Sequence, residues 1–152
     1  MSGRGKPYGK IDIEQKFCSH IITELFKKQH SPYSQPFCFP VDAVALGIPH
    51  YFDVIKTPMD MTTIRKKLTD GAYEACTDFE ADIRLMFNNC YTFNPPGTAV
   101  FNLGSQLEAV FNSKWNEKHS FMTQHGDMGR SRSKQFEVES SNDDEDGIII
   151  ID

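Results

Sequence analysis

Cysteine is sparse in this sequence, and the few cysteines are not spaced as metal or redox motifs. The 152 residues contain four cysteines, Cys18, Cys38, Cys76 and Cys90, and no two of them form a CxxC pair. The five histidines do not complete a zinc-ligand spacing with these cysteines either. The spacing therefore argues against a structural metal site, and we expect reduced thiols and no cofactor.

Long apolar runs are also missing from the chain. No run approaches the roughly 18 residues that a membrane span needs. The N-terminus lacks the apolar stretch of a signal peptide. From these two absences we expect an intracellular protein without a membrane partner.

Clusters of basic residues, which a nucleic-acid groove needs against the phosphates, are nearly absent. The formal net charge is -5 at pH 7, and residues 137–152 are acidic without a single base. The basic run Arg65-Lys66-Lys67 is interpreted as a solvated helix face. The charge pattern therefore argues against direct, sequence-specific binding of nucleic acid.

Apolar residues recur at helical spacing in four stretches, and no alternating strand pattern of useful length is present. The first stretch covers residues 12–29, and a short second one covers residues 60–68. The third is expected to begin at a cap on Thr77 or Asp78 and to end at Asn94. The fourth begins near Val100. Four helices with three connections predict an all-α, up-and-down four-helix bundle.

The connection between the first two predicted helices is unusually long. Residues 31–59 hold five of the eight prolines, interleaved with Tyr33, Phe37, Phe39, Tyr51 and Phe52. Loops of this length are uncommon in compact domains and are usually either functional or disordered. Because disordered segments are poor in aromatic residues, we expect this loop to be packed and functional.

The stretch CYTFNPPGTAV, residues 90–100, predicts where the third helix ends. Pro95 pushes the residue before it out of the α region, so Asn94 is expected at the helix end, beside an aromatic wall. In an up-and-down bundle, that helix end lies at the same pole as the long loop. The loop and Asn94 should therefore face each other at one pole, with both chain termini at the other.

The residues expected at this pole describe an apolar site with a few neutral polar groups. Its walls are expected to consist of Phe37, Val41, Leu46, Ile48, Cys90, Phe93 and Val100, with Tyr51 and Asn94 as the convergent polar groups. These residues include no carboxylate pair, phosphate cradle or base paired with a nucleophile, so we do not expect an enzyme. The ligand should be neutral, slim and capped by an amide-like group.

An acylated lysine fits these requirements. The Asn94 side-chain amide can donate to the acyl carbonyl, and the Tyr51 hydroxyl can reach the same oxygen through a water molecule. An unmodified lysine would bring an ammonium into the site without a carboxylate partner, which costs several kcal/mol or forces loss of the proton. Removal of the charge would therefore decide which lysines bind.

Two stretches carry a resemblance to a known family: PFCFPVDAVALGIPHYFDVIKTPMDMTTIRKKL and DFEADIRLMFNNCYTFNPPGTAVFNLGSQLEAVFNSKW. They resemble a bromodomain, and more narrowly the second bromodomain of the bromodomain and extra-terminal (BET) family as found in fungi. The resemblance covers residues 12–117. It implies a left-handed four-helix bundle that reads acetyl-lysine on histone tails and recruits transcription and chromatin proteins in the nucleus. Residues 1–11 and 118–152 are expected to be disordered tails, the second of them acidic.

The resemblance also implies roles for single residues. Asn94 falls on the family's acetyl-lysine-binding asparagine, Tyr51 on its water-bridging tyrosine and Val100 on its gatekeeper. Pro36 and Phe37 fall on its proline–phenylalanine shelf. These positions agree with the site expected from the residues alone.

Two positions depart from the family's pattern. The shelf usually opens with tryptophan, and Gln35 stands in that place, so we expect a weaker hydrophobic shelf and weaker contact with any ligand that leans on it. The residue before the asparagine is commonly tyrosine. Phe93 keeps the ring at that position but lacks the hydroxyl, with little expected cost.

Simpler interpretations remain open for the same residues. Asn94 could serve only as a helix C-cap, and Tyr51 and Phe37 could be ordinary core residues. A helical protein-interaction module could bind a non-acetylated peptide at the same pole. A Cys/His hydrolase would need Cys90 as its nucleophile, but no histidine is placed to activate it.

Both ends of the chain carry motifs outside the expected bundle. Residues 2–6, SGRGK, resemble the start of a core histone tail, so an acetylated Lys6 could bind the site of a neighbouring molecule. Near the other end, an acidic run precedes Ile148, Ile149, Ile150 and Ile151. This pattern resembles motifs that add a strand to a small ubiquitin-like modifier, or it marks a fragment boundary. The family resemblance also suggests that the chain is a piece of a longer protein.

Overall fold

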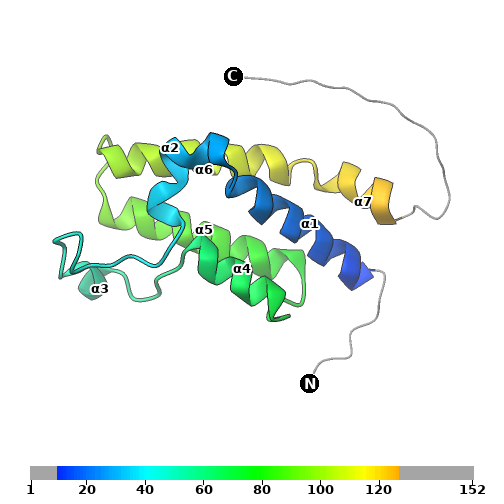
Figure 1. Cartoon of the computed structure of the whole chain (residues 1–152), viewed down its shortest axis with the longest axis horizontal. Coiled ribbons are helices and arrows are strands. Elements are labelled where there is room, and N and C mark those ends of the chain that lie inside the picture. The colour runs from blue at the N-terminus through cyan, green and yellow to red at the C-terminus, as the bar shows by residue number, and fades with distance from the viewer. Residues whose placement is uncertain (1–9, 127–152) are drawn as a thin grey trace.

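The computed structural model describes residues 10–126, and every regular element in that part of the chain is helical (Figure 1). The prediction of an all-α fold is therefore confirmed for these residues. The elements are α1 Lys10–Leu25, η1 Lys28–His30, α2 Ser31–Ser34, η2 Gln35–Phe37, α3 Tyr51–Val54, α4 Met61–Thr69, α5 Cys76–Phe93, α6 Ala99–Trp115 and α7 Lys118–Gly126, where η marks a short 3-10 helix.

Helices α1, α4, α5 and α6 pack around one apolar core (Figure 1). Each presents an apolar stripe inward, because residues three and four positions apart share one face of a helix. The fully buried side chains at the centre include Phe17, Ile21, Ile22, Leu25, Met61, Ile64, Phe79, Ile83, Phe87, Leu107 and Phe111. This core fixes the positions of the helix ends, where the connecting segments meet.

The N-terminal cap of α5 lies before the position that the sequence analysis predicted. The helix begins at Cys76, and Ala75 stands at the cap position that was predicted for Thr77 or Asp78. The Asp78 carboxylate accepts a hydrogen bond from the Ala75 N–H at 3.2 Å. Glu14 of α1 accepts one from the Cys76 N–H at 2.8 Å. These carboxylates satisfy the N–H groups of the cap residue and of the first helical residue, so the helix begins without a polar side chain at the cap position.

The long connection between α1 and α4 contains short helices, and only some of its apolar side chains are buried. After α1 ends at Leu25, earlier than predicted, residues 28–37 form η1, α2 and η2. Further along, Ala43, Tyr51 and Ile55 are buried in a small cluster of their own. Large apolar side chains of the same connection are exposed, namely Phe39, Val44, Leu46, Phe52 and Val54. The prediction of a packed loop therefore holds for one side of it.

Residues 118–126 correct the prediction of a disordered tail from residue 118 onward. They form α7, which packs along α1 (Figure 1). The ring centroids of Phe121 in α7 and Phe17 in α1 lie 5.2 Å apart. In the sequence, the large apolar residues of this helix are the adjacent Phe121 and Met122. The helix therefore lacks the apolar stripe at helical spacing from which the other helices were predicted.

The two ends of the bundle are arranged as the sequence predicted. The long connection and the junction between α5 and α6 lie at one end, and α1 begins and α7 ends at the other (Figure 1). We call the first the loop end, which comprises residues 35–58 and 90–100. We call the second the terminal end, which comprises residues 10–17, 67–82 and 111–126.

Several expectations concern residues or features beyond these elements. Within residues 10–126, none of the helices combines the length and apolar character of a membrane span. The same residues contain no group of three or more His, Cys, Asp or Glu side chains that could hold a metal ion. Lys6 and the isoleucines Ile148, Ile149, Ile150 and Ile151 lie outside the described residues, as do the motifs around them.

Candidate functional site

One half of the site is built on α3 and the end of α5. Tyr51 begins α3 and Phe93 ends α5, and their ring centroids lie 4.8 Å apart with the rings edge to face. Val41, Ile48 and Phe93 pack against the buried cluster that contains Tyr51. The structure therefore brings four of the predicted site residues into one apolar group.

The other half combines η2, α5 and α6. The Cys90 thiol donates to the Val100 backbone carbonyl oxygen at 3.4 Å, and Phe37 is buried in the main core. Gly104 of α6 allows this approach, because a Cβ at that position would lie 2.8 Å from Cys90 Sγ and 3.3 Å from Phe37 Cζ. The sequence reasoning missed Gly104, although a glycine inside a predicted helix was the available signal.

Asn94 is the C-cap of α5 and has an extended backbone, with φ -104° and ψ 123°. It does not adopt the left-handed conformation of the C-cap alternative. Its side-chain Nδ2 donates to the Cys90 carbonyl oxygen at 2.9 Å and lies 3.9 Å from Cys90 Sγ. A primary amide has two N–H donors, so among residues 10–126 the second donor has only a weak sulfur acceptor. This N–H can serve a ligand oxygen.

The hydroxyl of Tyr51 is the second polar group of the site. The residue is buried, and its hydroxyl has no hydrogen-bond partner among residues 10–126. Burial, with a smaller contribution from the Cys90 thiol, raises the pKa of Tyr51 above its usual range. The hydroxyl therefore stays neutral and remains a donor at physiological pH. Buried polar groups are normally hydrogen-bonded, so an unpartnered one at a predicted site marks a place for a polar ligand group.

Cys90 contributes a protonated thiol to the wall. Burial raises its pKa to about 11, although the Asn94 amide acts in the opposite direction. A thiolate is the nucleophilic form of cysteine, and at neutral pH this thiol remains protonated. The chemistry of Cys90 is therefore that of a small apolar wall residue, and the hydrolase interpretation gains nothing from the structure.

Three further predicted residues lie at the edge of the site. Leu46 is 64% exposed, whereas Val41 and Ile48 on either side of it are half-buried. Pro36 is half-buried and Gln35 is exposed on η2. The structure thus places Leu46 and Gln35 on the rim, where they can contact only the outer part of a ligand.

The loop that carries the site is fixed by hydrogen bonds to the bundle. The Cys38 carbonyl oxygen accepts from both the backbone N–H and the hydroxyl of Thr62, at 3.1 and 2.5 Å. Further along, the Asn89 side-chain amide of α5 donates to the Thr57 carbonyl oxygen at 2.8 Å. A site held by such contacts is largely preformed, which lowers the entropy that binding must overcome.

The turn between Cys38 and Thr57 has its own local contacts. The Asp42 carboxylate accepts from the Ala45 N–H at 3.1 Å, and the Asp42 carbonyl oxygen accepts from the Leu46 N–H at 3.0 Å. Gly47 follows with φ 72°, a left-handed conformation that glycine adopts without strain. This closed turn sets the position of Leu46 and Ile48 relative to the site.

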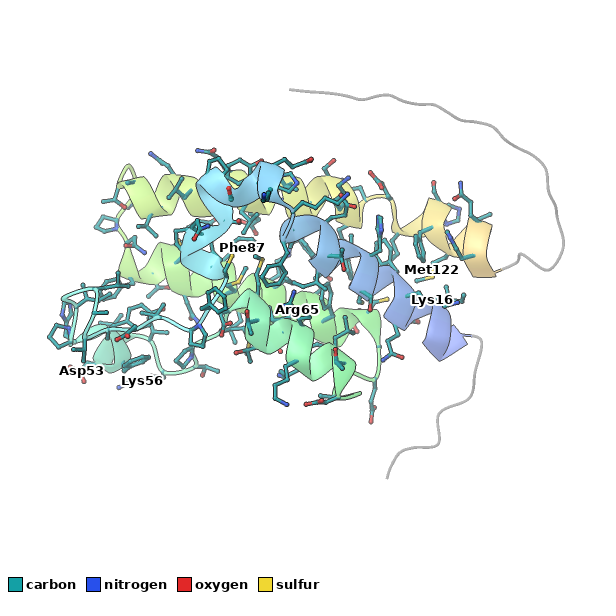
Figure 2. All side chains as sticks on the ribbon, viewed as in Figure 1. Lys16, Asp53, Lys56, Arg65, Phe87 and Met122 are labelled. Atoms are coloured by element: carbon teal, nitrogen blue, oxygen red, sulfur yellow. The ribbon has the colours of Figure 1, made fainter. Side chains whose placement is uncertain are left out.

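Charged side chains stay on the outside of the loop end. Asp42, Asp53 and Lys56 are exposed, and Figure 2 shows Asp53 and Lys56 at the outer edge of the molecule, away from the interior residue Phe87. None of the residues in the walls described above carries a charge. The site therefore suits a neutral ligand and offers no partner to a buried ammonium.

Comparison with known proteins gives matches over most of the described chain. The sequence model of the family described as Bromodomain matches residues 18–106. The chain is 45% identical over 150 residues to Bromodomain-containing factor 1 of Saccharomyces cerevisiae, covering 95% of this chain and 22% of that protein. It is 50% identical over 118 residues to the SWR1 complex bromodomain subunit bdf1 of Schizosaccharomyces pombe, covering 77% and 20% of the two chains.

Among solved structures, the second bromodomain of Candida albicans Bdf1, bound to an imidazopyridine, is similar in sequence and fold. It shares 53% identity with this chain at a TM-score of 0.66, over 67% of this chain and 96% of that one. The chain spans about a fifth of the length of the two curated relatives, at 22% and 20%. The similarity therefore concerns one module of longer proteins.

Proposed function

The chain belongs to the bromodomain family, and from this premise we propose that it binds acetylated lysine on histone tails through its loop end. Bromodomains are reader modules and not enzymes, and the relatives of this chain are fungal chromatin factors of the BET-like Bdf1 type. The observation that carries the proposal is the pair of donors left available in an uncharged apolar site. They are the Tyr51 hydroxyl and the second N–H of Asn94.

The proposed binding mode follows from these donors. The acyl carbonyl oxygen accepts from Asn94 Nδ2 in place of the weak contact with Cys90 Sγ. The Tyr51 hydroxyl reaches the same oxygen through a water molecule. The acyl methyl and the lysine methylenes pack on the walls that Phe37, Val41, Ile48, Phe93 and Val100 form. Asn94 keeps its bond to the Cys90 carbonyl oxygen at 2.9 Å, which orients the amide before a ligand arrives.

Selectivity for the acetylated form comes from the absence of charge in the walls. An ammonium in this site would lose its hydration without gaining a carboxylate partner, at a cost of several kcal/mol. Acetylation removes the charge and adds a carbonyl that the two donors can satisfy. The same chemistry excludes a free lysine and accepts the modified one.

The place of action and the partners follow from the relatives. One of them is named as a bromodomain subunit of the SWR1 complex, and the others as bromodomain-containing factors. We propose that this chain works in the nucleus, as part of a longer protein that brings transcription and chromatin proteins to acetylated histone tails.

The test is calorimetric titration of matched histone-tail peptides, acetylated and unmodified, into the protein. Ordering a flexible tail offsets much of the contact energy, so the expected dissociation constant for the acetylated peptide is on the order of 10 µM to 1 mM. The unmodified peptide should give no measurable heat. Equal binding of both peptides would instead identify a helical module that binds a non-acetylated peptide at this end.

A further inference from the structure

The exposed large apolar side chains of residues 13–125 all lie in one segment of the chain. They are Phe39, Val44, Leu46, Phe52 and Val54, with exposures of 46 to 84%. Isolated exposed apolar residues are ordinary, but a concentration of them marks a surface that binds something. All of them belong to the loop end, which also carries the acetyl-lysine site.

Phe39 stands out because its backbone is fixed on both sides. Phe37 and Cys38, just before it, are buried, and the Cys38 carbonyl oxygen is held by Thr62 through two hydrogen bonds of 3.1 and 2.5 Å. Pro40 follows and restricts the chain further. The Phe39 side chain is nevertheless 66% exposed. An aromatic ring presented on a rigid backbone loses little entropy when a ligand packs on it.

The position of Phe39 places it beside the site. It lies two residues from Phe37 and two residues from Val41, both of which are wall residues, and two residues of chain span at most about 7 Å. Gln35, which stands where the family's shelf has tryptophan, is exposed and offers no aromatic surface. The rim beyond Val41 continues with exposed apolar residues, Val44 and Leu46.

We propose that Phe39 is a specificity residue of the site, and that its ring binds an apolar side chain two or three positions from the acetylated lysine. The ring thereby takes over at position 39 the surface that a tryptophan at position 35 would provide. The inference rests on the proposed function, because it concerns the residues that flank the acetylated lysine in the same ligand. An apolar partner is favoured over a cationic one because the exposed side chains that follow on this rim include Val44 and Leu46, and the exposed Asp42 between them and Phe39 makes a cationic side chain the alternative to test.

The test uses a glycine- and serine-flanked acetyl-lysine peptide, and six derivatives that each place one leucine at positions -3 to +3. Each peptide is titrated into the wild-type protein, Phe39→Ala and Phe39→Trp. At one or more positions two or three residues from the acetyl-lysine, leucine should strengthen binding to the wild type about three- to tenfold. Phe39→Ala should abolish this gain and Phe39→Trp should keep it. All three proteins should bind the parent peptide alike.

Val54→Ala is the matched control, because Val54 is also exposed in the same loop, at 46%. It should retain the full gain from leucine. A gain that survives Phe39→Ala, or that Val54→Ala removes equally, would overturn the role of Phe39. A peptide with arginine in place of leucine at the same position is titrated in parallel, and a larger gain from arginine than from leucine would also overturn it.

A failure of the proposed function would give a different experimental result from a failure of the Phe39 inference. The wild-type protein would then bind neither the parent peptide nor any leucine derivative, and the role of Phe39 would fall with it. Parent-peptide binding without a leucine gain would leave the acetyl-lysine site standing and would reject the Phe39 inference alone. Thermal denaturation of each variant, expected to match the wild type because both residues are exposed, shows that any loss of binding is local.

Discussion

The two ends of the bundle differ in whether a tyrosine hydroxyl has a hydrogen-bond partner. At the terminal end, the Tyr73 hydroxyl donates to the Asp82 carboxylate at 2.6 Å, and Lys67 Nζ lies 2.6 Å from the same carboxylate oxygen. At the loop end, Tyr51 is a buried residue, and its hydroxyl has no hydrogen-bond partner in the described chain. Satisfied polar groups stabilise a fold, whereas an unsatisfied buried group costs stability until a ligand arrives.

Apolar side chains show the same contrast. At the terminal end, Trp115 stacks with Phe79 and Phe111 at centroid distances of 6.1 and 5.3 Å, and α7 covers Phe17. At the loop end, Phe39 and Leu46 remain exposed. Under the proposed function, one end contributes mainly stability and the other mainly recognition, so substitutions at the two ends should affect different measurements.

The largest expected effect comes from the core near the terminal end. Phe79 is fully buried, and Phe79→Ala should lower the free energy of unfolding by about 3–5 kcal/mol, because it removes packing and leaves a cavity. Phe39→Ala removes the same ring from an exposed position and should change stability by less than about 0.5 kcal/mol. Urea denaturation of both variants measures this. Similar losses would contradict the contrast between core and rim.

Asn94→Ala should affect recognition and leave the fold intact. Loss of the donor to the acyl oxygen should cost about 1–3 kcal/mol of binding to an acetylated peptide. Asn88→Ala is the matched control, because Asn88 is an exposed asparagine on the same helix and should bind as the wild type does. Calorimetry with unchanged affinity for Asn94→Ala would remove this residue from the site.

Gly104→Ala should affect both stability and recognition, because Gly104 lies where the core meets the site. A Cβ 2.8 Å from Cys90 Sγ and 3.3 Å from Phe37 Cζ forces these wall residues to move. Overpacking costs about 1–3 kcal/mol, and the higher helix propensity of alanine offsets about 1 kcal/mol.

Combining Gly104→Ala with Cys90→Ala checks this explanation. The double variant removes the sulfur that the new methyl group meets, so the two changes should be less harmful together than the sum of their separate effects. Denaturation and peptide titration are both needed. Strict additivity in the free energy of unfolding would show that the methyl group and the sulfur do not meet.

Gln35→Trp should have the smallest effect. It adds an aromatic surface at an exposed position, so it should strengthen ligands that extend along Pro36 and Phe37, and leave acetyl-lysine alone almost unchanged. A gain of about threefold for extended peptides is expected from partial burial of apolar surface. Equal gains for acetyl-lysine and for extended peptides would show that position 35 acts on the inner site and not as a shelf.

Local sequence patterns were sufficient to predict the main helices and the end of α5. Pro95 determines where α5 ends, and the apolar stripes identify α1, α4, α5 and α6. The misses depend on contacts between distant residues. Glu14 reaches the start of α5 from 62 positions earlier in the chain, and α7 is stabilised by packing on α1 and not by a stripe of its own.

The same distinction applies to the site. The resemblance and the residue types predicted Asn94, Tyr51 and the apolar walls as site residues, because each is marked by its neighbours in the sequence. Which wall residues are exposed could not be predicted, since burial depends on how the loop lies against the bundle. Leu46 at the rim and the exposed ring of Phe39 are consequences of that arrangement.

A comparison of Tyr51→Phe with Tyr73→Phe tests the division between the two ends most directly. Both variants remove one hydroxyl and keep the ring. Thermal or urea denaturation and titration with an acetylated histone peptide would be measured for each. Tyr73→Phe should lower stability by about 1–2 kcal/mol, because it loses a hydrogen bond to a carboxylate, and should bind the peptide normally. Tyr51→Phe should be as stable as the wild type or slightly more stable, because it loses no hydrogen bond within the described chain, and should bind about three- to tenfold more weakly. The opposite pattern, with Tyr51→Phe unstable and its affinity unchanged, would contradict the assignment of recognition to the loop end.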